Sequence, residues 1–133
     1  MTTKLREIDP DIVLSAALMG EKNNSIAYGQ NCNRMSEYLD IILPMSYISS
    51  YNYSYAQNAS VATWFAENVK KGTQVWHGFS TYDSSSKGLT AEQMLKDVQY
   101  VADHCPKVAG MGMFRYGIGT FPDFSGLFEN TQQ

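Results

Sequence analysis

Long hydrophobic runs, clusters of basic residues and closely spaced cysteines are all missing from this sequence. No apolar stretch approaches the roughly 20 residues that are needed to cross a bilayer, and the opening Met-Thr-Thr-Lys lacks the apolar region of a signal peptide. No run of lysine or arginine could neutralise several phosphates, and the formal net charge is -3. We therefore expect no membrane span and no nucleic-acid partner.

The two cysteines, Cys32 and Cys105, have neither C-x-x-C spacing nor a pair of histidines close to them. This spacing excludes the usual zinc sites, so we predict neither a metal nor a cofactor. Whether the two cysteines form a disulfide cannot be read from their positions. Three N-x-S sequons, at Asn23, Asn52 and Asn58, favour an extracellular or cell-surface location.

The chain has enough apolar material for one core. Of its 133 residues, 44% are hydrophobic and only 17% are charged. This length and composition predict a single globular domain over residues 1–133.

Short apolar runs alternate with helical patterns along the chain. The central run, residues 39–47, reads Leu-Asp-Ile-Ile-Leu-Pro-Met-Ser-Tyr, as expected for a strand buried on both faces. Because Pro44 has no N–H, it places Met45 and Tyr47 at the end of that strand. We predict strands over residues 11–19, 39–47, 73–82 and 108–116. We predict the end of a helix over 4–8, helices over 28–38 and 59–71, a third helix capped by Thr90 and ending before Pro106, loops over 48–57 and 83–88, and an irregular or short helical close over 121–128.

This alternation predicts an α/β fold with parallel strands and right-handed crossovers. Two architectures fit: four consecutive βα units of a TIM barrel, or a flavodoxin-like open parallel sheet. We favour the half barrel, because the chain begins with the end of a helix and its strands carry small residues where a barrel interior narrows. The first strand is also followed by no glycine-rich phosphate loop.

Three phrases carry a resemblance to a known family. They are Asp-Pro-Asp-Ile-Val-Leu-Ser-Ala at 9–16, Tyr-Leu-Asp-Ile-Ile-Leu-Pro-Met-Ser-Tyr at 38–47, and Gly-Met-Gly-Met-Phe-Arg-Tyr-Gly at 110–117. Together they resemble the C-terminal half of glycoside-hydrolase-like (β/α)8 barrels, the group that includes family 18 chitinase-like proteins. The resemblance implies that residues 1–133 are strands five to eight of such a barrel, and that the substrate is a polysaccharide or oligosaccharide.

The catalytic acid of the chitinase-like relatives is a glutamate in an Asp-x-Asp-x-Glu motif, which this sequence does not contain. The resemblance therefore implies that the acid belongs to an N-terminal half, and that this chain alone is inactive. The alternative is a non-catalytic carbohydrate-binding or cell-surface interaction module that has the shape of the barrel. The resemblance carries over two positions, Met45 and Tyr47, which match the sixth-strand Met-x-Tyr of the family. In chitinase-like sites that tyrosine helps to position the reacting group of the substrate.

The residues at predicted strand ends supply the other candidates. Glycoside hydrolysis usually needs two carboxyl groups, and Glu21 and Asp83 follow the first and third strands, although solvated loop acids are the more common alternative. The predicted substrate-binding residues are Met45, Tyr47, His77, Tyr82, Arg115 and Tyr116. A hydrogen-bonded core histidine is the stronger alternative for His77.

Aromatic side chains add possible platforms for sugar rings. Tyr51, Tyr53 and Tyr55 would share one side of an extended segment. Asp40, in contrast, lies at the amino end of its strand, where barrel residues serve stability.

Four barrel strands alone leave two open edges. We therefore expect the partner to be either an N-terminal half barrel or a second copy in a homodimer.

Overall fold

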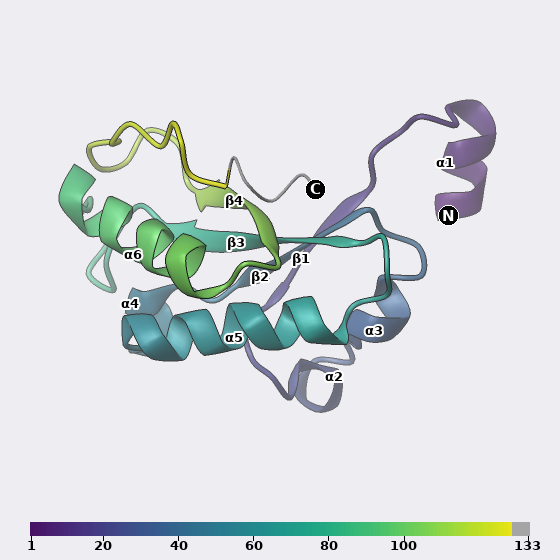
Figure 1. Ribbon diagram of the computed structural model, residues 1–133, viewed down its shortest axis with the longest axis horizontal. Coiled ribbons are helices and arrows are strands. Elements are labelled where there is room, and N and C mark those ends of the chain that lie inside the picture. Colours follow the sequence, from purple (N-terminus) through teal and green to yellow (C-terminus); the bar gives the residue numbers. More distant parts are fainter. Residues whose placement is uncertain (129–133) are drawn as a thin grey trace.

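A four-stranded, all-parallel β-sheet forms the centre of the protein (Figure 1). The computed structural model describes residues 1–128. The strands lie in the order β1-β2-β3-β4, and each pairs in parallel with the next one along the chain. They are β1 (Ser15–Met19), β2 (Ile41–Met45), β3 (Gln74–Ser80) and β4 (Val108–Phe114). The predicted α/β class with parallel strands is confirmed.

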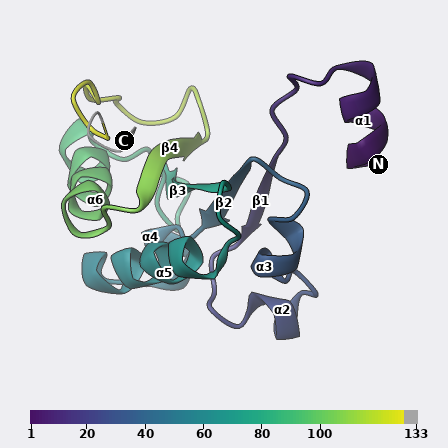
Figure 2. The same cartoon turned by 45° about the vertical axis from the view of Figure 1, so that its right-hand side comes forward.

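The two long helices cover the same face of this sheet. Figures 1 and 2 show α5 (Tyr55–Asn68) and α6 (Ala91–His104) side by side against β2, β3 and β4. Each begins with a capping box, Ser54 with Gln57 and Thr90 with Gln93. In each box the two side chains accept hydrogen bonds from each other's backbone N–H groups. The shorter helices are α1 (Thr2–Ile8), α2 (Asn24–Ala27), α3 (Cys32–Met35) and α4 (Ile48–Tyr51). Within residues 1–128, none of the helices has the length and apolar character of a membrane span.

The opposite face of the sheet is curved inward. Leu43 of β2 reaches so far past β3 that a Cβ added to Gly112 of β4 would collide with its Cδ2. Because β2 and β4 are separated by a whole strand, this contact requires the sheet to curl toward its uncovered side. A consecutive strand order, helices on one face and this curvature favour barrel units. A flavodoxin-like sheet has the order 2-1-3-4-5 and helices on both faces.

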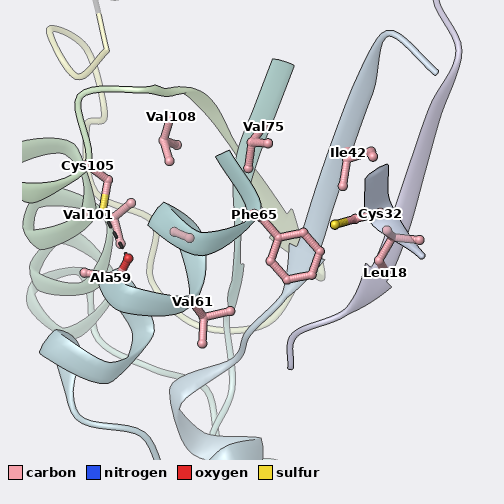
Figure 3. Packing of buried hydrophobic residues seen from close by; sticks show 11 residues of the cluster. Leu18, Cys32, Ile42, Ala59, Val61, Phe65, Val75, Val101, Cys105 and Val108 are labelled. Carbon is pink, nitrogen blue, oxygen red and sulfur yellow. Dashed lines mark hydrogen bonds between the residues drawn. The ribbon is translucent and has the colours of Figure 1, made fainter. Parts of the chain in front are cut away.

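The hydrophobic core lies between the sheet and the two long helices. Phe65 of α5 is fully buried, and Figure 3 shows its ring between Ile42 and Val75 of the sheet and the other apolar side chains around it. Cys32 and Cys105 are free thiols and buried, and the Cys105 thiol donates to the carbonyl of Ala59 at 3.2 Å. The core therefore explains both cysteines as packing residues, without a disulfide.

Several predicted boundaries were wrong for identifiable reasons. The helix predicted over 28–38 is shortened to α3, because Gly29 adopts a φ of 68° and separates α3 from the preceding helix α2. The predicted loop 48–57 contains α4 and the start of α5, since Ser54 is the cap of that helix. Helix α5 also ends at Asn68 rather than at residue 71. The first strand starts at Ser15 rather than at residue 11.

Helix α1 is joined to the sheet at the amino end of β2. The Arg6 guanidinium donates to both carboxylate oxygens of Asp40, at 3.0 and 2.9 Å, and the Leu14 N–H donates to Asp40 at 2.8 Å. These bonds hold the pKa of Asp40 below its ordinary value, and the bond from the Leu14 N–H contributes most. Asp40 therefore has the structural role that its position predicted.

Candidate functional site

Aromatic side chains gather at the carboxyl ends of the strands, on the uncovered side of the sheet. Alternation along β2 directs Ile42 and Pro44 toward the helices, where they are buried. Met45 points the other way, and Tyr47, two residues further on, stacks on Phe114 at the end of β4. The two ring centroids lie 5.9 Å apart with an interplanar angle of 6°.

Two further groups of tyrosines extend this arrangement on either side. Tyr82, after β3, packs on the same Phe114 ring with centroids 6.2 Å apart. Tyr51 and Tyr53, near α4, stack on each other with centroids 5.1 Å apart. We call Tyr47, Tyr51, Tyr53, Tyr82 and Phe114 the aromatic belt.

The hydroxyl groups of the belt lie close enough to influence one another. Burial, followed by the neighbouring Tyr82 and Tyr51, raises the pKa of Tyr47. Burial also raises the pKa of Tyr53, with a smaller contribution from Glu21. Tyr47 and Tyr53 therefore stay protonated, and each of these two hydroxyls can donate or accept a hydrogen bond.

Glu21 lies at the β1 end of the belt. Its carboxylate accepts a hydrogen bond from the Tyr28 hydroxyl at 2.9 Å, and this bond is the main reason that the pKa of Tyr28 is raised. Beside it, a hollow of about 530 Å³ lies between the loop after β1 and the first turns of α5, lined in part by Lys22, Tyr53 and Gln57. The size suits a small-molecule ligand, since such sites usually measure about 300–1,000 Å³.

The other predicted acid, Asp83, is occupied by its own loop. Its Oδ1 accepts from the N–H and hydroxyl of Ser85 and from the N–H of Lys87, at 2.9, 2.7 and 3.0 Å. These bonds lower the pKa of Asp83, the Ser85 side chain contributing most. A carboxyl group with a lowered pKa is a poor proton donor, so the geometry assigns Asp83 to the loop rather than to acid catalysis.

His77 lies on the opposite side of the sheet from the belt. Its side chain is fully buried under the two long helices, and its Nε2 is 3.3 Å from Asp97 Oδ1. Asn58 donates to the same oxygen at 2.8 Å. The structure places His77 in the core, the alternative that the sequence favoured, on the side of the sheet away from the belt.

Arg115 and Tyr116 lie just beyond β4, and both are exposed. The backbone of Arg115 is held by the hydroxyl of Thr81, which accepts from its N–H at 3.0 Å. Tyr116 stacks on Phe121, with centroids 5.6 Å apart, rather than on a belt ring. Among residues 1–128, no ring contact joins Tyr116 to the belt.

The prediction that Tyr51, Tyr53 and Tyr55 share one side of an extended segment was wrong for Tyr55. Tyr55 belongs to α5 and stacks on Tyr100 of α6, so only Tyr51 and Tyr53 stay together. Sequence reasoning missed two other features, the Tyr28 hydroxyl on Glu21 and the Asn58–Asp97 bond. The second was detectable, because both residues interrupt the apolar stripes of their helices, next to Val61 and Val98.

Comparisons with known proteins add no family assignment. No protein-family model, curated protein or solved structure matches the chain. Among residues 1–128, no three His, Cys, Asp or Glu side chains are placed to hold a metal ion. Functional arguments for this chain therefore depend on the geometry of the belt.

Proposed function

We propose that the protein binds an oligosaccharide or polysaccharide along the aromatic belt. The observation that carries this proposal is the parallel pair of Tyr47 and Phe114 at the carboxyl ends of two strands. Carboxyl ends of parallel strands are where ligands bind in α/β proteins. The C–H faces of sugar rings pack on aromatic faces, and the surrounding hydroxyls can bond to sugar hydroxyls.

Glu21 and the neighbouring hollow fit the same ligand class. A carboxylate, an ammonium group from Lys22 and an amide from Gln57 line or border a space of about 530 Å³. Convergent polar groups beside aromatic surface fix the orientation of a ligand. A chain of sugars can thus lie across the belt with one unit in the hollow.

Binding without hydrolysis is the better-supported form of this function. Hydrolysis requires a second carboxyl group that can give up a proton, and the loop bonds of Asp83 keep its carboxylate ionised. Participation in a glycoside hydrolase is the second candidate, and it is favoured by the position of Glu21 at the carboxyl end of β1. In that case the chain positions the substrate while another part supplies the acid. An extracellular or surface location is part of either proposal, and Asn23 and Asn52 are exposed sequon positions, whereas Asn58 is fully buried.

Titration calorimetry with a soluble chitin hexamer and with α- and β-linked glucan hexamers tests the proposal. Replacing Tyr47 by Ala removes a ring that should contribute about 1–2 kcal/mol, so the dissociation constant should rise roughly 5- to 30-fold. Tyr38→Ala is the control, because it removes the same side chain from an exposed position at the amino end of β2, away from the belt. If none of the hexamers binds, or if both variants weaken binding equally, the belt is not the site. Release of reducing ends from a hexamer by this chain alone would contradict binding without hydrolysis.

A further inference from the structure

We propose that a second copy of this chain docks on the uncovered face of the sheet and closes an eight-stranded parallel barrel around a two-fold axis. The first support is the state of the strand edges. Within residues 1–128, β1 and β4 each pair with one neighbour only. An edge strand presents unpaired backbone groups, and barrel closure removes both edges at once. In the dimer, β4 of each copy pairs in parallel with β1 of the other.

The side chains of the uncovered face are suited to a barrel interior. On β1 this face carries Ser15, Ala17 and Met19, and on β2 it carries Ile41, Leu43 and Met45. Gly112 leaves room for the Leu43 side chain, and Gly78 allows the close approach of the Pro44 backbone. The strand residues on this face carry no charge, whereas the solvated face of a sheet normally carries polar residues at every second position of each strand.

Exposed apolar side chains are concentrated beside the two free edges. Of the ten exposed large hydrophobic residues within residues 1–128, six lie in the segments that lead into β1 or end and follow β4. Met1, Ile8 and Val13 precede β1, and Met113, Phe114 and Tyr116 end or follow β4. Helix α1 has no buried residue; Figures 1 and 2 show it at the end of the extended segment that leads into β1, and its Arg6 side chain donates to both carboxylate oxygens of Asp40. In a closed barrel the helix that precedes a strand packs over the neighbouring strand, here β4 of the second copy, where it would lie beside Phe121, Phe124 and Leu127, which pack with Met111 against the same buried cluster.

The size of this surface is sufficient for a stable dimer. Strand spacing of about 4.8 Å and a rise of about 3.3 Å per residue give the four-stranded face a plan area of roughly 400 Å². Two such faces therefore bury on the order of 800 Å². Two strand seams and two α1 helices add to this and bring the total into the range of about 1,200–2,000 Å² that stable interfaces bury.

Closure also changes the candidate site, and this part of the inference rests on the proposed function. A two-fold axis along the barrel keeps all eight carboxyl ends at one mouth. The aromatic belts of both copies then surround that mouth, so that Tyr47 and Phe114 of one copy face the same opening as those of the other. One feature limits the β1 seam: Gln30 Oε1 accepts from the N–H of Met19 at 2.8 Å, so that this side chain has to move aside for pairing to extend to Met19.

Sedimentation velocity of the chain without carbohydrate tests closure separately from ligand binding. We expect a species of twice 14.9 kDa at micromolar concentrations. Ala17→Glu buries a charge inside the closed barrel but leaves it exposed in a monomer, so it should raise the dimer dissociation constant about 100-fold or more. Ala27→Glu is the matched control, because Ala27 is exposed on α2, and it should leave the dimer intact.

Amide hydrogen exchange provides a second measurement that does not depend on the variants folding. Amides along the outer edges of β1 and β4 should become more protected as the concentration of wild-type chain rises. A monomer at all concentrations overturns the proposal and indicates that a different chain covers this face. Open-ended assembly, a dimer insensitive to Ala17→Glu, or edge amides without concentration dependence overturns it as well. A dimer that binds no hexamer would leave closure standing and refute the carbohydrate function instead.

Discussion

Replacing Asp97 by Ala tests whether the buried polar cluster fastens the two long helices to the sheet. Asp97 Oδ1 accepts from Asn58 at 2.8 Å and lies 3.3 Å from His77 Nε2. Asn58 and His77 are both fully buried. The substitution therefore removes the acceptor of the buried Asn58 amide and the carboxylate beside the buried His77 ring.

The size of the effect can be worked from these contacts. A hydrogen bond to a charged acceptor contributes about 1.5–3 kcal/mol, and a buried donor left unsatisfied costs about 1–3 kcal/mol. Removal of the partly desolvated carboxylate offsets some of this loss. We expect Asp97→Ala to lower the free energy of unfolding by about 2–4 kcal/mol, and Asp97→Asn, which keeps an acceptor oxygen, to lower it by about half as much.

Urea unfolding followed by circular dichroism measures the difference, with an unchanged m-value showing that the same surface is exposed. Asp103→Ala is the control on the same helix. Asp103 is exposed and accepts only from Gln99, so this variant should shift stability by less than about 0.5 kcal/mol. Asn58→Ala should add little to Asp97→Ala, because the two residues share one bond. A loss below about 1 kcal/mol for Asp97→Ala, or full additivity with Asn58→Ala, would refute the view that the cluster acts as a unit.

Two further predictions concern the sheet itself. Asp40 has a lowered pKa in the folded chain, so its contribution to the free energy of unfolding is present above the unfolded pKa of about 3.9 and is lost as the pH falls through the folded pKa. Asp40→Asn should abolish this part of the acid dependence, which is below about 1 kcal/mol for a part-exposed pair. Urea midpoints at neutral and acid pH measure the difference. Gly78→Ala would place a methyl group 2.5 Å from the carbonyl oxygen of Pro44 and should lower stability in thermal unfolding by about 1–3 kcal/mol. Gly72→Ser is the comparison, because no atom lies within 4 Å of a Cβ added at Gly72 but its φ is +100°. Gly72→Ser therefore reports backbone strain without crowding.

The strands and the two long helices could be predicted because local signals agreed with the fold. The run around Ile42 is apolar on both sides of Pro44, and Thr90 with Gln93 is a complete capping signal. Asp40 was placed correctly, since its position at the amino end of a strand follows from the strand itself. These features depend on neighbours within a few residues of one another.

Features that depend on distant contacts could not be predicted. The curl of the sheet is visible only in the meeting of Leu43 with Gly112 and of Tyr47 with Phe114. His77 shares the helix side of β3 with Val75 and Phe79, and its partners Asn58 and Asp97 come from two helices that lie far from it in the sequence. Tyr55 was placed with its neighbours because the cap at Ser54 was not recognised. In each case the deciding partner is far along the chain.

The two faces of the sheet explain why polar chemistry and aromatic chemistry are separated in this protein. On the helix side, His77 and Asn58 are enclosed by apolar packing, where a ligand cannot enter without unfolding the layer. On the uncovered side, Tyr47 and Phe114 have no helix to pack against, and nothing in the core requires a parallel aromatic pair at that position. Stability therefore accounts for the first group and not for the second. The strand that ends at Met45 serves both, since alternate residues along it face the core and the mouth.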